Sequence, residues 1–540
     1  MKDISSTGSF IDFTLENFIY VDKTEYIPKL VKLKRVFISR PRRFGKSLTL
    51  DTIATLFETG VEPYFKGTWI YDKWTEPTYP VLRLNFLNFD KNSLEKFNNK
   101  LNSKITEFAE LNKVTTYKEK EEAEDSIDHL LEQLRLENRQ IVILIDEYDC
   151  QMTANINNET LYKQFQEKIK SFYANIKDKF AIKFLGITGV TRLKDVAIFS
   201  VGSDINDITN DSAYSQMIGF TRDEIKKYYI DYLKLAASCE NKCRVEEVTD
   251  TQIESMLDMM AQNYDGYCFD EFYKKKVFST WSVNKFFQSV VSNKFVYFGE
   301  YWYDNGGLPS ILVNYLKTHE LNIFEYLDKD KFLKVSSDDF KNPTALTTIN
   351  QNVLMCQTGY LTLRSDLNKT STVALGIPNG EIYKALNRLL ANNIFKGNTD
   401  ITDDYGISLL EVGTVEDIIN LFNSALNSVS YDNYPIVSES SVQNMLKLYL
   451  LGAHQKVLSE VHEAKGRADL VVNTDNRRIV FEFKYAKNET EAKSKLLDAV
   501  EQIKTRDYGN IVPKKTELLR IATVFNADPK VRAFTEYQSV

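Results

Sequence analysis

The N-terminal part of the chain, up to about Thr221, alternates short apolar runs with longer amphipathic stretches. This alternation is typical of α/β domains, in which crossover helices join parallel strands. Four apolar runs predict buried strands, because each is short, rich in β-branched or aromatic residues and followed by polar or turn residues. The predicted strands are Val36–Ser39, Val81–Phe86, Ile141–Ile145 and Lys183–Thr188.

Helical periodicity replaces the strand signals between Thr221 and Phe395. Within this region the pattern predicts helices at Glu224–Leu235 and Ile253–Gln262, and upstream the charged segment Lys118–Leu134 is also predicted to be helical. Aromatic side chains are dense between residues 264 and 287. We interpret them as core residues rather than as a surface on which nucleic-acid bases stack.

A polar stretch, Lys396–Tyr405, predicts the boundary before a last domain. That domain begins with helices, one of them starting near Glu439. Alternating and apolar runs then predict further elements. These are strands at Ala468–Val472, Ile479–Phe483 and Leu519–Phe525 and a helix at Glu489–Thr505.

The length of 540 residues fits about three domains, which we assign to residues 1–220, 221–400 and 401–540. A hydrophobic fraction of 43% with 26% charged residues excludes disordered and fibrous classes. The five cysteines contain no CxxC pair, so we expect no disulfide framework and a reducing compartment, the cytoplasm. No apolar run approaches the ~20 residues of a membrane span, and we expect no membrane partner.

The first candidate site is the sequence VFISRPRRFGKSLTL, which passes from a predicted strand through a short loop into a helix. Gly45, Lys46 and Ser47 stand where the helix begins, and free backbone N–H groups and the helix dipole favour a phosphate there. Lys46 would reach the β- and γ-phosphates, and the Ser47 hydroxyl would bind Mg²⁺. Arg40 occupies the position where the P-loop pattern has its first glycine.

The apolar run of the third predicted strand ends in Asp146 and Glu147. In a buried parallel strand, functional groups gather at the carboxyl end. Asp146 would hold Mg²⁺ through water, and Glu147 would polarise the attacking water. The fourth strand ends at Thr188, which would sense the γ-phosphate, and Arg192 would stabilise charge on the transferred phosphoryl group. Thr188 and Arg192 fit a loop-capping role equally well.

The second candidate site is the sequence GRADLVVNTDNRRIVFEFKYA. Alternation places Glu482 and Lys484 on one face of a strand, with Phe481 and Phe483 on the other. A neighbouring strand would bring Asp469 beside Glu482, so that the two carboxylates share one Mg²⁺. Lys484 would then orient a water and offset negative charge on a pentavalent phosphate.

The segments VDKT, RPRRFGKS, IDEYD and ITGVTRL resemble the AAA-ATPase-like family of prokaryotic proteins, and later segments (DGYCF, TGYLT, LGIPNGEI) extend the resemblance over nearly the whole chain. The family lacks the first P-loop glycine, so Arg40 is a family trait. The resemblance implies a P-loop parallel-sheet core followed by a helical region, and binding of ATP with Mg²⁺. It assigns the nucleotide site to Arg43, Phe44, Gly45, Lys46, Ser47, Leu48, Asp146 and Thr188.

The order of motifs after residue 438 resembles the PD-(D/E)XK nuclease superfamily, specifically the nuclease-like domain found behind AAA-ATPase-like domains. By this resemblance Asp469, Glu482 and Lys484 match the active-site triad. Gln502 matches the glutamine of the following helix, and Glu439 matches the acid of the first helix, with Asp469, Glu482 and Glu439 as metal ligands. The proline that commonly precedes the aspartate is absent.

The sequence therefore predicts an ATP-binding and hydrolysing protein coupled to a Mg²⁺-dependent nuclease. The alternative is an ATP-dependent switch or scaffold whose nuclease-like domain is a non-catalytic docking module. With a net charge of −7, contact with nucleic acid needs locally basic surface, and residues 451–540 carry 16 Lys and Arg against 13 Asp and Glu. We favour DNA over RNA as partner, although no base-reading motif separates them, and protein partners or a homo-oligomer stay open.

Overall fold

A computed structural model divides the chain into two compact units. Unit 1 comprises Met1–His319 and Phe332–Ile382, and unit 2 comprises Glu320–Lys331 and Tyr383–Val540. The predicted boundary at Lys396–Tyr405 falls largely outside the described residues. The structure describes residues 1–177, 179–193, 205–302, 310–316, 319, 323–343, 345–346, 348–395, 404–453, 455–463, 466–509 and 517–540.

Unit 1 is built on a parallel sheet of five strands in the order β2-β3-β4-β1-β5. All six residues of β3 are buried, as expected for a central strand covered on both faces. The four strands predicted from apolar runs are thereby confirmed. The strands are β1 (Arg35–Ser39), β2 (Val81–Asn85), β3 (Ile141–Asp146), β4 (Ile182–Gly189) and β5 (Asn206–Asp207).

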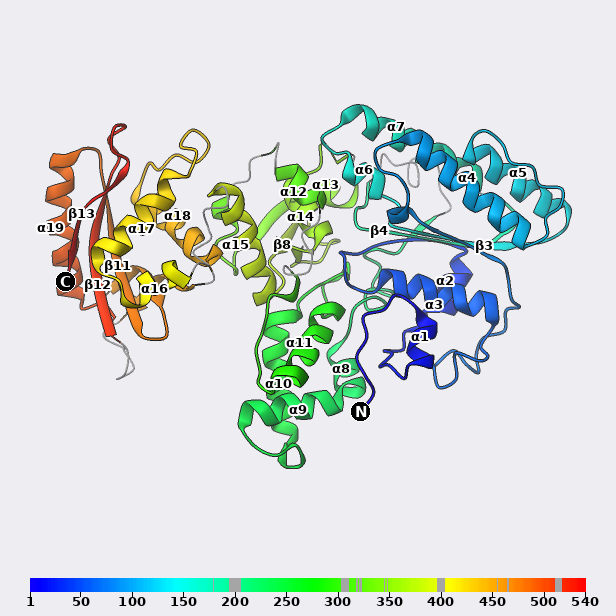
Figure 1. The fold of residues 1–540 in the computed structure, drawn as a ribbon, viewed down its shortest axis with the longest axis horizontal. Helices are drawn as coiled ribbons and strands as arrows, with labels where there is room; N and C mark the ends of the chain where they lie inside the picture. The colour runs from blue at the N-terminus through cyan, green and yellow to red at the C-terminus, as the bar shows by residue number, and fades with distance from the viewer. Residues whose placement is uncertain are drawn as a thin grey trace. The chain divides into compact units, whose positions relative to one another are not determined.

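Helices cover both faces of this sheet, with α2 and α3 on one face and α4, α5 and α7 on the other (Figure 1). Because all strands run the same way, their carboxyl ends meet at one edge, and the loops there can form a shared site. The helices of this part are α1 (Phe10–Leu15), α2 (Ile27–Leu33), α3 (Lys46–Thr59), α4 (Leu94–Leu111), α5 (Ala123–Leu136), α6 (Cys150–Ala154) and α7 (Glu159–Ile176).

Helix α5 starts at Ala123, so the predicted helix at Lys118–Leu134 is wrong for its first turn. Two asparagines of α4 hold the preceding segment in place through its carbonyl groups. Asn102 donates to the carbonyls of Lys120 and Glu121 at 3.0 Å, and Asn98 donates to Glu121 at 2.9 Å. A carbonyl bound by a side chain is not available to a helical N–H, and the helix therefore begins after it.

The middle of the chain is helical, as predicted, and packs within unit 1. The predicted helix at Glu224–Leu235 is in fact two helices, because Tyr229 leaves helical geometry with φ −112° and ψ 22°. The buried Tyr229 hydroxyl donates to Asn284 at 2.6 Å, a tertiary contact that local periodicity does not encode. The helices here are α8 (Arg222–Tyr228), α9 (Ile230–Asn241), α10 (Asp250–Tyr264), α11 (Thr280–Asn293), α12 (Ser310–Leu316), α13 (Ser337–Lys341) and α14 (Gln351–Thr358).

This middle region also contains a small antiparallel sheet, ordered β6-β8-β7, which the sequence pattern did not predict. Strands β6 and β7 have only four and two residues, and β8 has five. They are β6 (Leu333–Ser336), β7 (Thr362–Leu363) and β8 (Thr372–Gly376).

Most of the aromatic cluster forms core, as interpreted from the sequence. Five rings of the cluster are buried, whereas Phe272 is exposed and Trp281 is half-buried. The buried rings are Tyr264, Tyr267, Phe278, Phe286 and Phe287.

Unit 2 contains a second five-stranded sheet, ordered β13-β12-β11-β10-β9, in which only the β11–β12 pair is parallel. Helix α19 packs on one face, and α17 packs against the other (Figure 1). The predicted strands β10, β11 and β12 are confirmed, and the edge strands β9 and β13 were not predicted. The strands are β9 (Lys456–Glu463), β10 (Gly466–Asn473), β11 (Arg477–Ala486), β12 (Glu517–Asn526) and β13 (Ala533–Ser539).

The predicted α/β fold class, with a parallel-sheet core, a helical middle and a C-terminal α/β domain, is confirmed. Within the described parts of the chain, no helix combines the length and apolarity needed to cross a bilayer. The remaining helices are α15 (Gly380–Ile394), α16 (Asp404–Val412), α17 (Val415–Asn427), α18 (Glu439–Gly452) and α19 (Glu489–Arg506).

A buried carboxyl at the start of α15 connects α11 to the rest of the helical middle. Glu381 accepts hydrogen bonds from the Ser282 hydroxyl at 2.7 Å and from the Trp302 backbone N–H at 2.8 Å. Burial raises the pKa of Glu381 to about 8, partly offset by these hydrogen bonds.

We expect Glu381 to make the stability of unit 1 depend on pH. In the unfolded chain this carboxyl loses its proton near its ordinary value of 4.5, whereas the folded protein keeps it until about pH 8. Wild-type stability should therefore fall by a few kcal/mol as pH rises from about 4.5 to about 8, and a Glu381→Gln variant should lack this slope. Urea unfolding followed by tryptophan fluorescence measures this, because all four tryptophans lie in unit 1. Parallel curves for both proteins would contradict the assignment.

Candidate nucleotide and nuclease sites

The loop between β1 and α3 has the backbone shape of a phosphate-binding turn. Gly45, immediately before α3, has φ +103°, and Arg43 has φ +68°. A left-handed residue at this point turns the chain so that the first N–H groups of α3 face outward without intrahelical partners. These groups and the helix dipole favour an anion at Lys46 and Ser47.

The conformation of Arg40 shows how the loop accommodates an arginine at the position of the first P-loop glycine. Its side chain turns into the interior, where Nη1 donates to the carbonyls of Ser39 at 2.8 Å and Thr209 at 2.6 Å. The guanidinium lies 4.1 Å from the ring centre of Phe269, and burial lowers the Arg40 pKa to about 9. Because the side chain points away from the loop, it does not obstruct the turn in front of α3.

The amino group of Lys46 lies inside the loop. It donates to the carbonyls of Arg40 at 3.1 Å and Pro41 at 3.2 Å, and it lies 3.5 Å from a carboxylate oxygen of Glu147. Only 4% of the Lys46 side chain is exposed. The loop therefore holds a buried cation whose partners are mostly neutral carbonyls, an arrangement that suits an incoming phosphate.

Asp146 at the end of β3 forms hydrogen bonds with residues of three other elements of this site. Its carboxylate accepts hydrogen bonds from the hydroxyls of Ser47 at 2.6 Å and Thr188 at 2.5 Å. Asn85 at the end of β2 donates to it at 3.4 Å. Glu147 follows with φ +54°, an uncommon conformation for a residue with a side chain.

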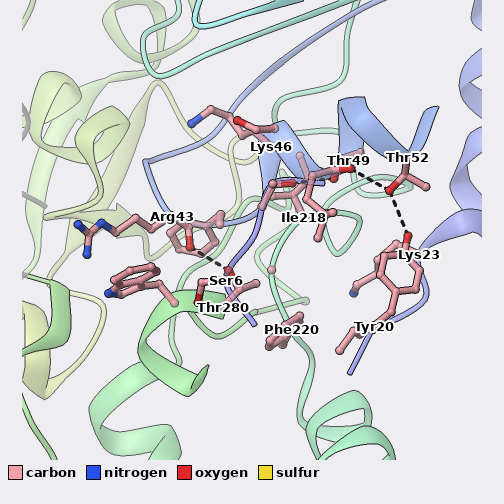
Figure 2. Close-up of a pocket in the computed structure, with 18 of the residues that line it drawn as sticks. Ser6, Tyr20, Lys23, Arg43, Lys46, Thr49, Thr52, Ile218, Phe220 and Thr280 are labelled. Atoms are coloured by element: carbon pink, nitrogen blue, oxygen red, sulfur yellow. Dashed lines mark hydrogen bonds between the residues drawn. The ribbon is translucent and has the colours of Figure 1, made fainter. Parts of the chain in front are cut away.

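A cavity of about 480 Å³ opens beside the loop, Lys46, Ser47 and Glu147, a volume in the range of small-molecule sites. Figure 2 shows Lys46, Thr49, Ile218, Phe220 and Thr280 around it. The lining includes the loop and the start of α3. It also includes apolar and aromatic side chains, among them Ile19, Tyr20, Val21, Ile27, Met217, Ile218 and Phe220. Phosphate-binding groups together with apolar side chains that could contact a base fit a nucleotide.

The helical middle closes one side of the cavity through the N-terminus of α11. The Thr280 hydroxyl donates to the Arg43 carbonyl at 2.9 Å, and the Arg43 guanidinium lies 4.3 Å from the Trp281 ring centre (Figure 2). Partial burial, followed by the neighbouring Arg42 charge, lowers the Arg43 pKa. The loop and the helical middle thus share one wall of the site.

The other residues predicted for this site take varied positions. Leu48 and Phe44 both line the cavity, and the buried Phe44 ring has its centre 4.7 Å from that of Tyr267. Arg192 forms an ion pair with Asp207 and donates to the Lys341 carbonyl. The structure therefore brings Thr188 to Asp146 but engages Arg192 in other contacts.

In unit 2, β10 and β11 bring the predicted triad together. Their register pairs Leu470 with Phe481, so Asp469 lies across from Glu482. Phe481 and Phe483 form an aromatic layer with Phe422 and Phe534 on the opposite face. The strand alternation predicted for β11 is confirmed.

Lys484 joins the two acidic residues nearest to it. Its amino group lies 2.8 Å from a Glu482 carboxylate oxygen and 3.5 Å from one of Glu439. Glu482 is completely buried, and its second carboxylate oxygen has no hydrogen-bond partner within the described structure. Burial, and then the neighbouring Asp469, raise the pKa of Glu482 to about 7.

Asp469 is held in place by two neighbouring elements. Its carboxylate accepts the Phe483 backbone N–H at 2.9 Å, and its own carbonyl accepts from Gln443 of α18. Gln502 of α19 donates to the Tyr508 hydroxyl at 3.4 Å. The structure therefore groups Asp469, Glu482, Lys484 and Glu439, with Gln502 bonded to a neighbouring tyrosine.

The donor set of this site suits a hard cation. Among the described residues, no group of three or more His, Cys, Asp and Glu side chains is arranged as a complete metal site. Mg²⁺ commonly uses only one or two carboxylates and keeps several waters or substrate oxygens. Asp469 and the unpartnered oxygen of Glu482 supply such a pair.

Comparison with known proteins agrees with these two sites. Residues 5–199 match the family model described as a predicted AAA-ATPase, and residues 437–534 match that of the PD-(D/E)XK nuclease superfamily. The chain joins an AAA-ATPase-like domain to a nuclease-superfamily domain.

Two similar proteins accompany the family matches. An uncharacterized protein in the vnfD 5′ region of Azotobacter chroococcum mcd 1 is 25% identical over 95% of this chain and 94% of its own length. The crystal structure of Cdc6p from Pyrobaculum aerophilum is 11% identical and covers 68% of this chain and 93% of that one, with a TM-score of 0.23. A TM-score of 0.23 is too low to support a fold assignment. The fold of both domains is therefore assigned from the strand order and from the family matches.

Several residues around the AAA-ATPase-like cavity were missed by sequence reasoning. Trp281 and Thr280 lie more than 200 positions from the loop that they contact, and Ser5–Gly8 line the cavity from the start of the chain. The only signal for Trp281 was the density of aromatic residues around it. In the nuclease-superfamily domain, Gln443 was likewise missed, because its contact is to a backbone carbonyl.

We expect Lys484 to be required for the stability of the nuclease-superfamily domain. Lys484→Met leaves buried Glu482 without a cation and should destabilise the domain by about 3–5 kcal/mol. Adding Glu482→Gln should recover most of that loss, because no unpaired charge then stays buried. Hydrogen exchange in peptides of β11 and β12 measures the local free energy of opening.

The matched control is Lys493→Met on α19, whose partner Glu489 is exposed. It should cost no more than about 0.5 kcal/mol. An equal cost for Lys484→Met with and without Glu482→Gln would show that packing, rather than charge pairing, explains the effect.

Proposed function

We propose that this protein binds and hydrolyses ATP and that its C-terminal domain cleaves nucleic-acid phosphodiester bonds with Mg²⁺. The observation that carries the nuclease part is the buried Glu482, placed across from Asp469 and paired with Lys484. A buried carboxylate with a second carboxylate across from it is unfavourable unless a cation neutralises the pair. A docking surface has no need for this arrangement.

In the nucleotide site, each residue has a distinct task. Lys46 and the first N–H groups of α3 would bind the phosphates, with Arg43 beside them. Ser47 and Asp146 would hold Mg²⁺, which when bound neutralises phosphate charge. Glu147, 3.5 Å from Lys46, would accept a proton from the attacking water. Thr188 keeps Asp146 oriented through its hydrogen bond.

In the nuclease site, Asp469 and Glu482 would hold Mg²⁺, which when bound polarises a phosphate oxygen. The ion pair with Lys484 favours the charged form of Glu482 and orients its carboxylate. Lys484 would also hold a water near the phosphate and offset the charge that develops there. Glu439, half-exposed and 3.5 Å from Lys484, completes the acidic side of the site.

We expect two substitutions to separate ATP binding from hydrolysis. Lys46→Ala should abolish binding of a fluorescent ATP analogue, because the loop loses its buried cation. Glu147→Gln should bind the analogue with unchanged affinity but hydrolyse ATP about 10²–10⁴-fold more slowly, because it lacks the proton acceptor. Lys73→Ala, on an exposed lysine paired with Asp72, is the control. Unchanged hydrolysis in Glu147→Gln would contradict the assigned role.

Cleavage should require the two carboxylates and Mg²⁺. Plasmid, single-stranded DNA and RNA are each incubated with the full chain, with Mg²⁺ or EDTA, and with or without ATP. Asp469→Asn and Glu482→Gln should lower the cleavage rate by at least about 10²-fold. Lys493→Ala should cleave like wild type, since its ion pair lies on an exposed face of α19.

The same assay tests the switch hypothesis. ATP hydrolysis without cleavage of any substrate would overturn the nuclease assignment and leave a nucleotide-dependent docking protein. Cleavage that changes with ATP, ADP or a non-hydrolysable analogue would establish coupling between the domains.

A further inference from the structure

The turn after α19 is fixed by its backbone and by one arginine. Asp507 and Gly509 both have left-handed φ values, +50° and +83°, which reverse the chain around Tyr508. Arg520 of β12 donates to the Tyr508 carbonyl at 2.6 Å and pairs with Asp507 at 2.7 Å. Tyr508 therefore has a defined position at the end of the helix.

The hydroxyl of Tyr508 forms hydrogen bonds with two side chains of α19. Its ring is fully buried in the core with Ala468 and Val480. The hydroxyl accepts a hydrogen bond from Arg506 Nη1 at 3.0 Å and another from Gln502 Nε2 at 3.4 Å. A buried ring thus orients an arginine whose own side chain is exposed.

Gly466 allows this group to lie directly on β10. A Cβ atom at residue 466 would lie 2.6 Å from Arg506 Cδ and 3.2 Å from the Tyr508 hydroxyl oxygen. Any larger side chain would therefore displace Arg506. Gly466 precedes Asp469 by three strand residues, or about 10 Å, so the arginine lies beside the triad and not within it.

Arg506 is a cation with spare donors on the side of the domain that carries the acidic site. Within the described residues, the Arg506 guanidinium donates one hydrogen bond, to the Tyr508 hydroxyl, and it forms no ion pair with a carboxylate. The hydrogen bond to Tyr508 is the largest cause that raises the pKa of Arg506, and the negative charges of Glu482 and Asp469 raise it further. A guanidinium offers five N–H donors in a planar fork that matches phosphate.

We propose that Arg506 binds a backbone phosphate of the nucleic acid, a few nucleotides from the bond to be cleaved, and that Gln502 and Tyr508 are its positioning residues. This inference rests on the proposed function, since it places the substrate strand along β10 and past Asp469. An arginine–phosphate contact depends on the charge of the backbone and not on the base sequence, so Arg506 would bind DNA and RNA in the same way.

The test measures binding of fluorescent duplex DNA, single-stranded DNA and RNA to the full chain in a Glu482→Gln background, so that no substrate is cleaved. Adding Arg506→Ala should remove one phosphate contact and reduce the salt slope of duplex affinity by about 0.9. The affinity advantage of the parent protein over this variant should then shrink about 3.5-fold between 50 and 200 mM salt. Arg506→Lys should retain the slope, because it retains the charge.

Two controls separate this role from folding and from total charge. Lys493→Ala removes the same charge from the same helix and should leave the salt slope unchanged. Tyr508→Phe keeps the buried ring but frees the guanidinium, so affinity should fall while the salt slope persists. In a cleaving background, Arg506→Ala should raise KM and leave kcat within about two-fold, as expected when ground-state and transition-state binding weaken equally.

The outcomes also distinguish this inference from the proposed function. An unchanged salt slope in Arg506→Ala, or an equal loss in Lys493→Ala, would overturn the role of Arg506 whether or not wild type cleaves. A reduced slope in a protein that cleaves nothing would support the Arg506 contact and overturn the nuclease assignment.

Discussion

The hydrogen bonds accepted by Asp146 connect the three elements on which the nucleotide site depends. Ser47 reaches it from α3 and Thr188 from β4, while Asp146 itself ends β3. In a nearly dry setting, a carboxylate with these donors fixes its neighbours strongly. The start of α3 and the neighbouring Glu147 are held at this junction, and the parallel sheet brings the three elements to it.

The second site solves a related problem of buried charge in another way. Asp146 is surrounded by neutral hydroxyl donors, whereas Glu482 has a lysine on one oxygen and nothing recorded on the other. Both carboxylate oxygens of Asp146 accept hydrogen bonds, whereas one oxygen of Glu482 accepts none within the described structure. This difference separates a carboxylate whose two oxygens are both hydrogen-bonded from one that, among the described residues, has a free oxygen.

The sequence predicted those parts of the molecule whose signals are local. Strands β3 and β11 were found because burial and alternation are visible within a few residues, and their chemistry stands at strand ends or on one strand face. The break at Tyr229 was missed, and the contact made there, a hydrogen bond from the Tyr229 hydroxyl to Asn284, is a tertiary one that local periodicity does not show. Trp281 was missed as a cavity residue, since only the folded chain brings it to Arg43. Edge strands such as β9 carry too little buried surface to leave a strong pattern.

Strand β11 carries core and chemistry on alternate residues, and this has a consequence for misfolding. A slip of one residue in its pairing would move Phe481 and Phe483 to the face that carries the acidic residues and turn Glu482 and Lys484 into the aromatic layer. The slipped form would be both unstable and chemically inert. The register that brings Asp469, Glu482 and Lys484 together is the same one that completes the core. The proposed nuclease activity would therefore be confined to chains that have folded correctly.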